Sequence, residues 1–274
     1  MTRKETRESY AKRLQRVVEH IWANLDQPLD LNQLADIACL SPYHFHRVYR
    51  AMIGETVAET LSRSRLHRAS NALARSDLPI AVIARKASYA STAAFSRAFR
   101  AAYGASPGAF RTFSQKSIGA STMPVQVLNR PALRIAAVRH KGPPQEIGAA
   151  FDKVMAWAGP KGVAMPPAVG VAVYLSDMAS VPPQDQEALA GLSVGPDIEA
   201  DDIVVIHEIP AGKQAVLLYK GPYAQIGKGY QELFGWLPSS GEEPAQQPCF
   251  EINLNDPRQT APEDLLTELC LPLK

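Results

Sequence analysis

The stretch HKGPPQEIGAAFDKVMAWAG at residues 140–159 recurs, with conservative changes, as YKGPYAQIGKGYQELFGWLP at 219–238. Sliding the second half of the chain against itself by 79 residues extends the match in both directions. Upstream, PALRIAAVRHKGP aligns with PAGKQAVLLYKGP; downstream, GVAVYLSD aligns with CFEINLND. A repeat of this length is a structural unit rather than a chance resemblance.

Each copy reads as strand, helix, strand, with one further strand predicted at 202–210 and at 265–273. A βαββ unit of about fifty residues cannot bury its apolar sheet face alone, so the two copies are expected to pair. The sequence therefore predicts an α+β domain over 125–274 with a groove where the copies meet.

Alternation along the strand at 250–254 suggests what this groove contains. Phe250, Ile252 and Leu254 are expected to pack on the helix of their copy, leaving Glu251 and Asn253 on the groove side. A carboxylate with an aromatic wall suits a lipophilic cation, because ion pairing and cation–π attraction both strengthen when water is excluded. The other side chains expected to contribute to this ligand site are Tyr174, Tyr219, Tyr223, Trp157 and Trp236.

The formal net charge of the chain is only +2, but the charged residues are unevenly distributed between its two parts. Residues 1–118 hold 18 Lys and Arg against 9 Asp and Glu, whereas residues 119–274 hold 11 against 18. A basic first part favours a polyanionic partner, and an acidic second part favours a cationic small molecule. The Ser-, Thr- and Gly-rich segment before Pro124 reads as a linker, so we expect a head at 1–118, a linker at 119–124 and a tail at 125–274.

The head reads as an all-α domain. A first amphipathic helix stops before Pro28, and the following stretch, DLNQLADIACLSPYHFHRVYRAMIG, predicts a helix capped by Asp30, a tight turn, and a second helix capped by Ser41. In the second helix, Phe45 and Tyr49 belong to the packing face. The opposite face has chemistry suited to a DNA major groove, and it carries Tyr43, His44, His46, Arg47 and Arg50.

The same unit appears a second time. IARKASYASTAAFSRAFRAAYG at 83–104 repeats the pattern with one inserted residue, and an Arg-rich helix at 61–76 is predicted to connect the two. Two helix-turn-helix units about one DNA turn apart could read successive major grooves of double-stranded DNA. The second set of candidate contacts is Ser91, Thr92, Ala93, Arg97 and Arg100.

Residues 8 to about 113 resemble the AraC/XylS family of transcription regulators, on the motifs SPYHFHRVYR with its following glycine and AFSRAFRAAYGASPGAFR. The resemblance implies base-facing residues at Tyr43, His46 and Arg47 in the first recognition helix. In the second, it implies Thr92, Ala93 and Arg97. Members of the family often carry larger polar residues where this chain has Ala93 and Ala94, so the second helix is expected to serve mainly as a backbone clamp.

Residues 125–274 resemble the GyrI-like small-molecule-binding domain. The motifs that carry this resemblance are GPY at 221–223, WLP at 236–238, FEINLNDP at 250–257 and PEDLLTELCLPL at 262–273. It implies that Glu251 faces a ligand pocket, and that hydrophobic or cationic compounds are sensed there.

Together these features predict a ligand-responsive, sequence-specific DNA-binding transcription regulator, not an enzyme, that meets promoter DNA, a small-molecule effector and RNA polymerase. Two alternatives stay open. Glu251 could act as a general base in a hydrolase-like groove, or the tail could bind a protein partner while the head binds DNA. The GLSVG stretch at 191–195 matches a serine hydrolase motif but lacks the required helix after it, so a nucleophilic Ser193 is not favoured.

Other classes are disfavoured. Three cysteines without CxxC spacing predict reduced thiols, and His44 and His46 form a polar surface pair rather than a metal site. No glycine pattern for a nucleotide cofactor is present, and no cofactor is expected. The charged first residues and the lack of a long apolar run predict a cytoplasmic chain without a membrane span.

Overall fold

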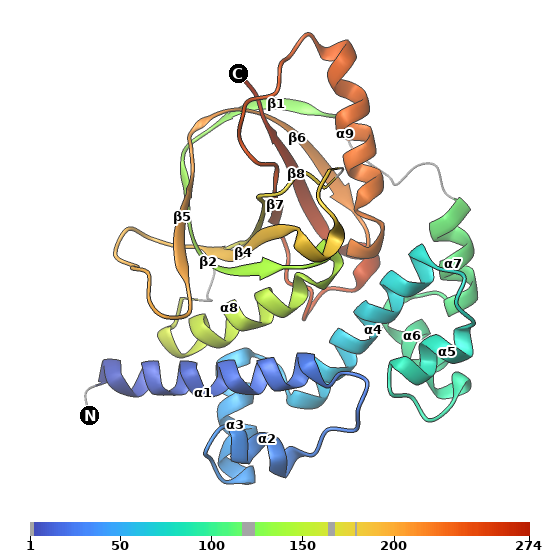
Figure 1. Cartoon of the computed structure of the whole chain (residues 1–274), viewed down its shortest axis with the longest axis vertical. Coiled ribbons are helices and arrows are strands. Elements are labelled where there is room, and N and C mark those ends of the chain that lie inside the picture. The colour runs from blue at the N-terminus through green and yellow to red at the C-terminus, as the bar shows by residue number, and fades with distance from the viewer. Residues whose placement is uncertain (1–2, 117–123, 164–167, 179) are drawn as a thin grey trace.

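The computed structural model describes residues 3–116, 124–163, 168–178 and 180–274. A helical head precedes a curled antiparallel sheet that carries two helices on its outer face (Figure 1). The segment expected to be the linker, 119–124, lies outside the described residues except for Pro124. In the part of the chain that the structure describes, none of the helices combines the length and apolar character needed to cross a bilayer.

The head consists of two helix-turn-helix units and a long connecting helix. Its helices are α1 (Arg3–Ala23), α2 (Leu31–Ile37), α3 (Pro42–Ile53), α4 (Val57–Arg75), α5 (Ile80–Lys86), α6 (Thr92–Tyr103) and α7 (Pro107–Lys116). As predicted, Asp30 caps α2 by accepting a hydrogen bond from the Asn32 amide. The turns of the two units share a left-handed residue, Cys39 (φ 53°) in the first and Ser88 (φ 58°) in the second. From this residue to the serine that caps the next helix, the first unit has two steps (Cys39 to Ser41) and the second has three (Ser88 to Ser91). The inserted residue of the second unit therefore lies between Ser88 and Ser91.

The tail consists of an eight-stranded sheet, two long helices and short 3₁₀ turns. Its strands are β1 (Gln126–Arg130), β2 (Leu133–Lys141), β3 (Gly170–Tyr174), β4 (Glu187–Ser193), β5 (Val205–Ile209), β6 (Gly212–Lys220), β7 (Phe250–Asn253) and β8 (Leu266–Pro272). Its helices and turns are α8 (Gly148–Lys161), α9 (Gly227–Ser240), η1 (Pro144–Glu146), η2 (Pro183–Asp185), η3 (Tyr223–Gln225) and η4 (Pro262–Asp264). The bounds of β1, β2, α8 and β4 shifted by 79 residues give those of β5, β6, α9 and β8.

The sheet order is β1-β6-β8-β7-β3-β4-β2-β5, and every pair is antiparallel. We call β2, α8, β3 and β4 the first half of the tail, and β6, α9, β7 and β8 the second half. The halves meet at the β3–β7 pair, where Ala172 lies opposite Glu251. The edge strands are exchanged, because β1 precedes the first half in sequence but pairs with β6, and β5 precedes the second half but pairs with β2.

The predicted packing of the 250–254 strand is wrong. Phe250 and Ile252 do not face a helix; they pack against other strands in a core enclosed by the curled sheet, together with residues such as Val173 and Cys270. Leu254 is largely exposed. The reason is the curl, which buries both faces of the sheet: one against its own strands, the other against α8 and α9. Glu251 therefore lies on the helix side.

Strands β1 and β4 were not predicted. Strand β4 contains Gly191 and Ser193 of the hydrolase-like stretch, so a strand does run into this motif, but no helix follows it. The Ser193 hydroxyl accepts a hydrogen bond from the Val169 amide at 2.9 Å, which joins β4 to the start of β3.

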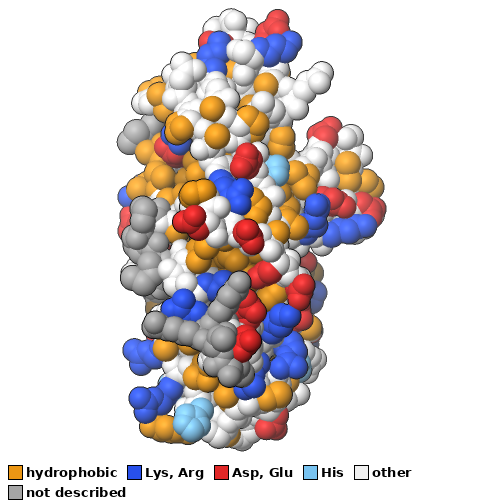
Figure 2. Space-filling view, turned by 90° about the vertical axis from the view of Figure 1, so that its left-hand side faces the viewer, with side chains coloured by type: hydrophobic (Ala, Val, Ile, Leu, Met, Phe, Trp, Pro, Cys, Tyr) orange, Lys and Arg blue, Asp and Glu red, His pale blue; other side chains and the backbone are white. Residues whose placement is uncertain are grey.

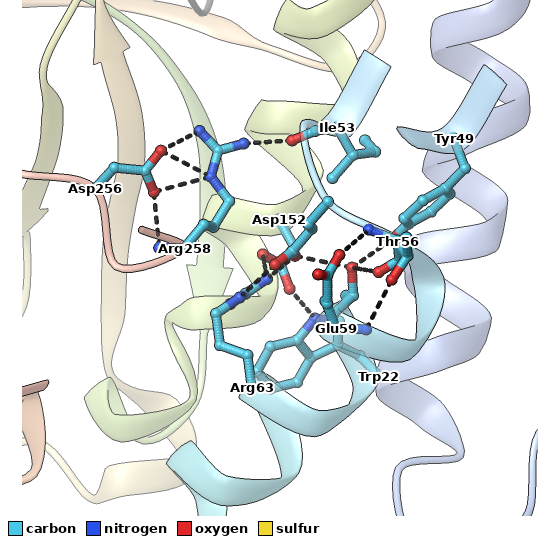
Figure 3. Close-up of polar contacts among 11 residues, drawn as sticks. Trp22, Tyr49, Ile53, Thr56, Glu59, Arg63, Asp152, Asp256 and Arg258 are labelled. Carbon is cyan, nitrogen blue, oxygen red and sulfur yellow. Dashed lines mark hydrogen bonds and ion pairs between the residues drawn. The ribbon is translucent and has the colours of Figure 1, made fainter. Parts of the chain in front are cut away.

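Head and tail share an extensive interface centred on α8, which lies between α1 and the sheet (Figure 1). Asp152 of α8 is 8% exposed and accepts hydrogen bonds from Trp22 Nε1 at 2.9 Å and Arg63 at 2.8 Å. Arg63, which points toward Asp152 in Figure 3, also pairs with the buried carboxylate of Glu55 at 2.6 Å. The network continues through Thr60, which donates to Glu55 and lies 2.9 Å from the Tyr49 hydroxyl of α3.

Candidate DNA interface and ligand site

The two recognition helices, α3 and α6, are built in the same way. Ser41 and Ser91 cap them, each side chain accepting a hydrogen bond from the amide three residues on. Each helix ends at a glycine with a left-handed backbone conformation, Gly54 (φ 86°) in α3 and Gly104 (φ 67°) in α6. This conformation is unfavourable for residues that have a Cβ, so glycine is preferred there. Local sequence thus fixes where both helices start and stop.

The outer face of α3 is exposed, while Phe45 and Tyr49 on its inner face are buried. Tyr43 is 66% exposed. Its hydroxyl accepts a hydrogen bond from Arg47 at 2.7 Å, and the Arg47 guanidinium lies 5.5 Å from its ring centroid. The residues predicted to contact DNA from α3, all exposed, are Tyr43, His44, His46, Arg47 and Arg50.

Helix α6 repeats this division. Phe95 and Phe99 are fully buried against the second helical core. The residues predicted to contact DNA from α6 and its cap, all exposed, are Ser91, Thr92, Ala93, Arg97 and Arg100. On the face of the molecule drawn in Figure 2, by contrast, basic and acidic side chains are interspersed, so that face presents no field of one sign.

Glu251 is the charged centre of the candidate ligand site. It is 5% exposed, and its carboxylate accepts a hydrogen bond from the Tyr174 hydroxyl at 2.8 Å across the β3–β7 pair. Burial raises the pKa of Glu251 to about 7, and the Tyr174 and Tyr230 hydroxyls beside it limit that rise. A glutamate in this setting changes its charge near neutral pH.

Tyrosines surround this carboxylate. The Tyr230 ring of α9 meets the Tyr174 ring edge to face, with centroids 6.3 Å apart, and stacks on Phe234 at 6.1 Å. The Tyr223 hydroxyl is buried and has no hydrogen-bond partner among the described residues, whereas the Tyr230 hydroxyl lies beside the Glu251 carboxylate and lowers its pKa. Burial, and the nearby Glu251 carboxylate, raise the pKa of both phenols. A buried hydroxyl without a hydrogen-bond partner is costly, and its position near a buried carboxylate is typical of a ligand-binding site.

The structure brings together only some of the residues predicted for this site. The Tyr174 hydroxyl donates a hydrogen bond to Glu251, and the Glu251 carboxylate lies near enough to Tyr223 to raise the pKa of its phenol. Asn253 lies two residues along β7, where it accepts a hydrogen bond from Thr267. Tyr219 is buried under α9 and donates to the Pro222 carbonyl.

Neither tryptophan lies beside Glu251. Trp157 of α8 is buried in the core between this helix and strands β2 and β4, where its Nε1 donates to Asp201 at 2.7 Å. Trp236 packs at the margin of the core under α9. Sequence reasoning missed Tyr230 and Phe234, although their spacing of four residues on a predicted helix placed them on one helix face. Among the described residues, no group of three His, Cys, Asp or Glu side chains is arranged to hold a metal ion.

Both the head and the tail match known protein families. The family model described as a GyrI-like small molecule binding domain matches residues 123–274, and a helix-turn-helix domain model matches residues 34–112. A DNA gyrase inhibitor of Erwinia billingiae is 31% identical over 157 residues, which cover 55% of this chain and 97% of that protein. The regulatory protein SoxS of Salmonella typhimurium is 30% identical over 103 residues, 38% of this chain and 96% of that protein.

The HTH-type transcriptional regulator YbfP of Bacillus subtilis is 32% identical over 107 residues, 39% of this chain. The match spans only 36% of YbfP, so the two proteins share a part and not a whole. Among solved structures, the EcmrR–DNA complex in EcmrR-RPo covers 88% of this chain at 15% identity, with a TM-score of 0.47. From the two family matches, the chain belongs to the family of proteins with a GyrI-like small molecule binding domain, joined here to an AraC-type helix-turn-helix region.

Proposed function

We propose that this protein is a transcription regulator that binds promoter DNA through α3 and α6 and responds to a small molecule bound beside Glu251. The observation that carries the proposal is the presence, in one chain, of two exposed, equivalently capped recognition helices and of a buried carboxylate surrounded by tyrosine side chains. The two halves of the tail are then copies of one βαββ unit, and the site lies where they join.

The DNA contacts follow from the exposed faces. Arg47 is held by Tyr43 in a helix whose other face is fully packed, which favours bidentate pairing with a base edge. The other DNA contacts proposed for this face are Tyr43, His44, His46 and Arg50. Helix α6 offers Ser91, Thr92, Arg97 and Arg100 with a small Ala93, which suits contacts to the phosphate backbone more than to base edges.

The ligand is a lipophilic cation. A buried carboxylate attracts a positive charge strongly, and the Tyr174, Tyr223 and Tyr230 rings offer cation–π contacts with it. Because the Tyr223 hydroxyl has no hydrogen-bond partner among the described residues, this side chain loses no hydrogen bond within that part of the chain when it moves aside for a ligand. Binding should strengthen as pH rises through about 7, where Glu251 becomes charged.

Replacing Arg47 by alanine tests the DNA part of the proposal. The variant should lose about 1–3 kcal/mol of binding free energy on a sequence selected from random DNA, and little on unrelated DNA. Fluorescence anisotropy at fixed salt measures both affinities. Arg139→Ala removes an exposed arginine from strand β2 of the tail and serves as the control. Equal loss on both DNAs would make Arg47 a phosphate contact and refute base recognition by this residue.

A further inference from the structure

Each helix-turn-helix unit is docked on a different half of the tail. The core of the first unit, around Phe45 and Tyr49, includes Ala156 of α8. Beside it, Gly159 of α8 lies so close to α3 that a Cβ at this position would come within 1.8 Å of the Met52 carbonyl oxygen. The first unit therefore sits directly on the first half of the tail.

The second unit sits on the second half. Its core, around Phe95 and Phe99, includes Ala224 of η3. Gln225, the next residue, donates a hydrogen bond to the Ser114 hydroxyl of α7 at 2.8 Å, and both side chains are buried. Turn η3 starts at Tyr223, so the segment that carries this unit also borders the Glu251 site.

The loop between β7 and β8, residues 254–265, reaches the C-terminal ends of both recognition helices. Arg258 donates a hydrogen bond to the Ile53 carbonyl at the end of α3, and Asp256 holds its guanidinium with contacts of 2.6 to 3.0 Å (Figure 3). Farther along, Glu263 Oε1 lies 2.9 Å from the position that a Cβ on Gly104, the residue ending α6, would occupy. One loop, which follows Glu251 by three residues, thus contacts both helices.

We propose that the tail sets the spacing between the two recognition helices, and that Arg258 and Gly159 are positioning residues for DNA recognition. The inference rests on the proposed function. Helix α4 joins the two units, and their docking on different halves adds a second connection, so we expect their separation to depend also on that of the halves and on the 254–265 loop. A cation inserted beside Glu251, at the junction of the halves, then alters the separation, and with it the preferred number of base pairs between the two half-sites.

The test uses the full chain without ligand. A sequence selected by the wild-type protein from random DNA is remade with the distance between its half-sites changed one base pair at a time. Wild type should show one sharp optimum. Arg258→Gln, which cannot span to the Ile53 carbonyl while paired with Asp256, should weaken binding at that optimum by about tenfold and flatten the profile. Gly159→Ala, which forces α3 off α8, should shift the optimum.

Two controls separate spacing from folding. Gly235→Ala replaces a glycine of α9 that has open space around it, and Lys274→Gln removes an exposed ion pair with Glu243. Both should keep the wild-type profile. If Arg258→Gln and Gly159→Ala, folded as judged by circular dichroism, also keep it, the proposal is wrong.

A second measurement needs no DNA, so it separates this inference from the proposed function. Spin labels at the exposed Cys39 and at the exposed position 86 in the variant Lys86→Cys, Cys249→Ser report the distance between the two units. Pulsed electron paramagnetic resonance should give a narrow distance distribution that broadens in Arg258→Gln and shifts when tetraphenylphosphonium is added. An unchanged distribution in both cases would overturn the inference, even if DNA binding by the wild type were established.

Discussion

Replacing Asp152 by alanine should lower the free energy of unfolding by about 3–5 kcal/mol, the largest effect we expect from one substitution. The carboxylate is the shared acceptor of Trp22 and Arg63 at the head–tail interface. Without it, the indole N–H loses its partner and the guanidinium loses one of the two carboxylates to which it donates hydrogen bonds, keeping Glu55. Uncompensated groups of this kind are costly because the interface excludes the water that would otherwise solvate them.

Urea unfolding followed by tryptophan fluorescence measures this loss. Glu19→Ala is the matched control, because it breaks the neighbouring interface pair with Lys153, in which the Glu19 side chain is half exposed. That pair should be worth less than about 1 kcal/mol. A loss in Asp152→Ala no larger than in the control would show that the buried network does not hold the head on the tail.

Replacing Glu251 by glutamine should change the pH dependence of stability. In the wild type, burial raises the pKa of Glu251 to about 7, whereas in the unfolded chain a glutamate titrates near 4.3. Between these values the unfolded state ionises first, so the wild type loses stability as pH rises, by about 4 kcal/mol in total. The neutral glutamine has no such cost. The stability of the variant relative to wild type should therefore rise from pH 4 to pH 8.

Thermal unfolding across this pH range gives the comparison. Glu187→Gln, at an exposed position of β4, is the control, and its difference from wild type should stay constant. A constant difference for Glu251→Gln as well would mean that the carboxylate is solvated in the folded protein and that the buried site does not exist as described.

Most features that the sequence predicted correctly depend on short sequence patterns. Ser41 and Gly54 mark the ends of α3, and the same chemistry marks α6, because caps and left-handed glycines act within a few residues. The internal repeat likewise predicted where the tail helices lie. Each of these features depends on neighbours along the chain.

The errors arose where distant segments meet. Phe250 was placed against a helix because alternation defines two faces of a strand but not which one a curled sheet encloses. Trp157 was placed near Glu251, but its indole pairs with Asp201 instead. The exchange of β1 and β5, and the docking of α3 on α8, depend on contacts between residues far apart in sequence. The repeat gave no sign of either.

The most direct test of the central claim is the affinity of the full chain for its selected DNA with and without tetraphenylphosphonium, for wild type and Glu251→Gln, with neutral triphenylphosphine oxide as the control compound. We predict that the cation changes the wild-type affinity by about tenfold at pH 8, that triphenylphosphine oxide does not, and that Glu251→Gln binds DNA but ignores both. An equal response to the cation in wild type and Glu251→Gln would contradict the account, because the effector would then act without the buried carboxylate.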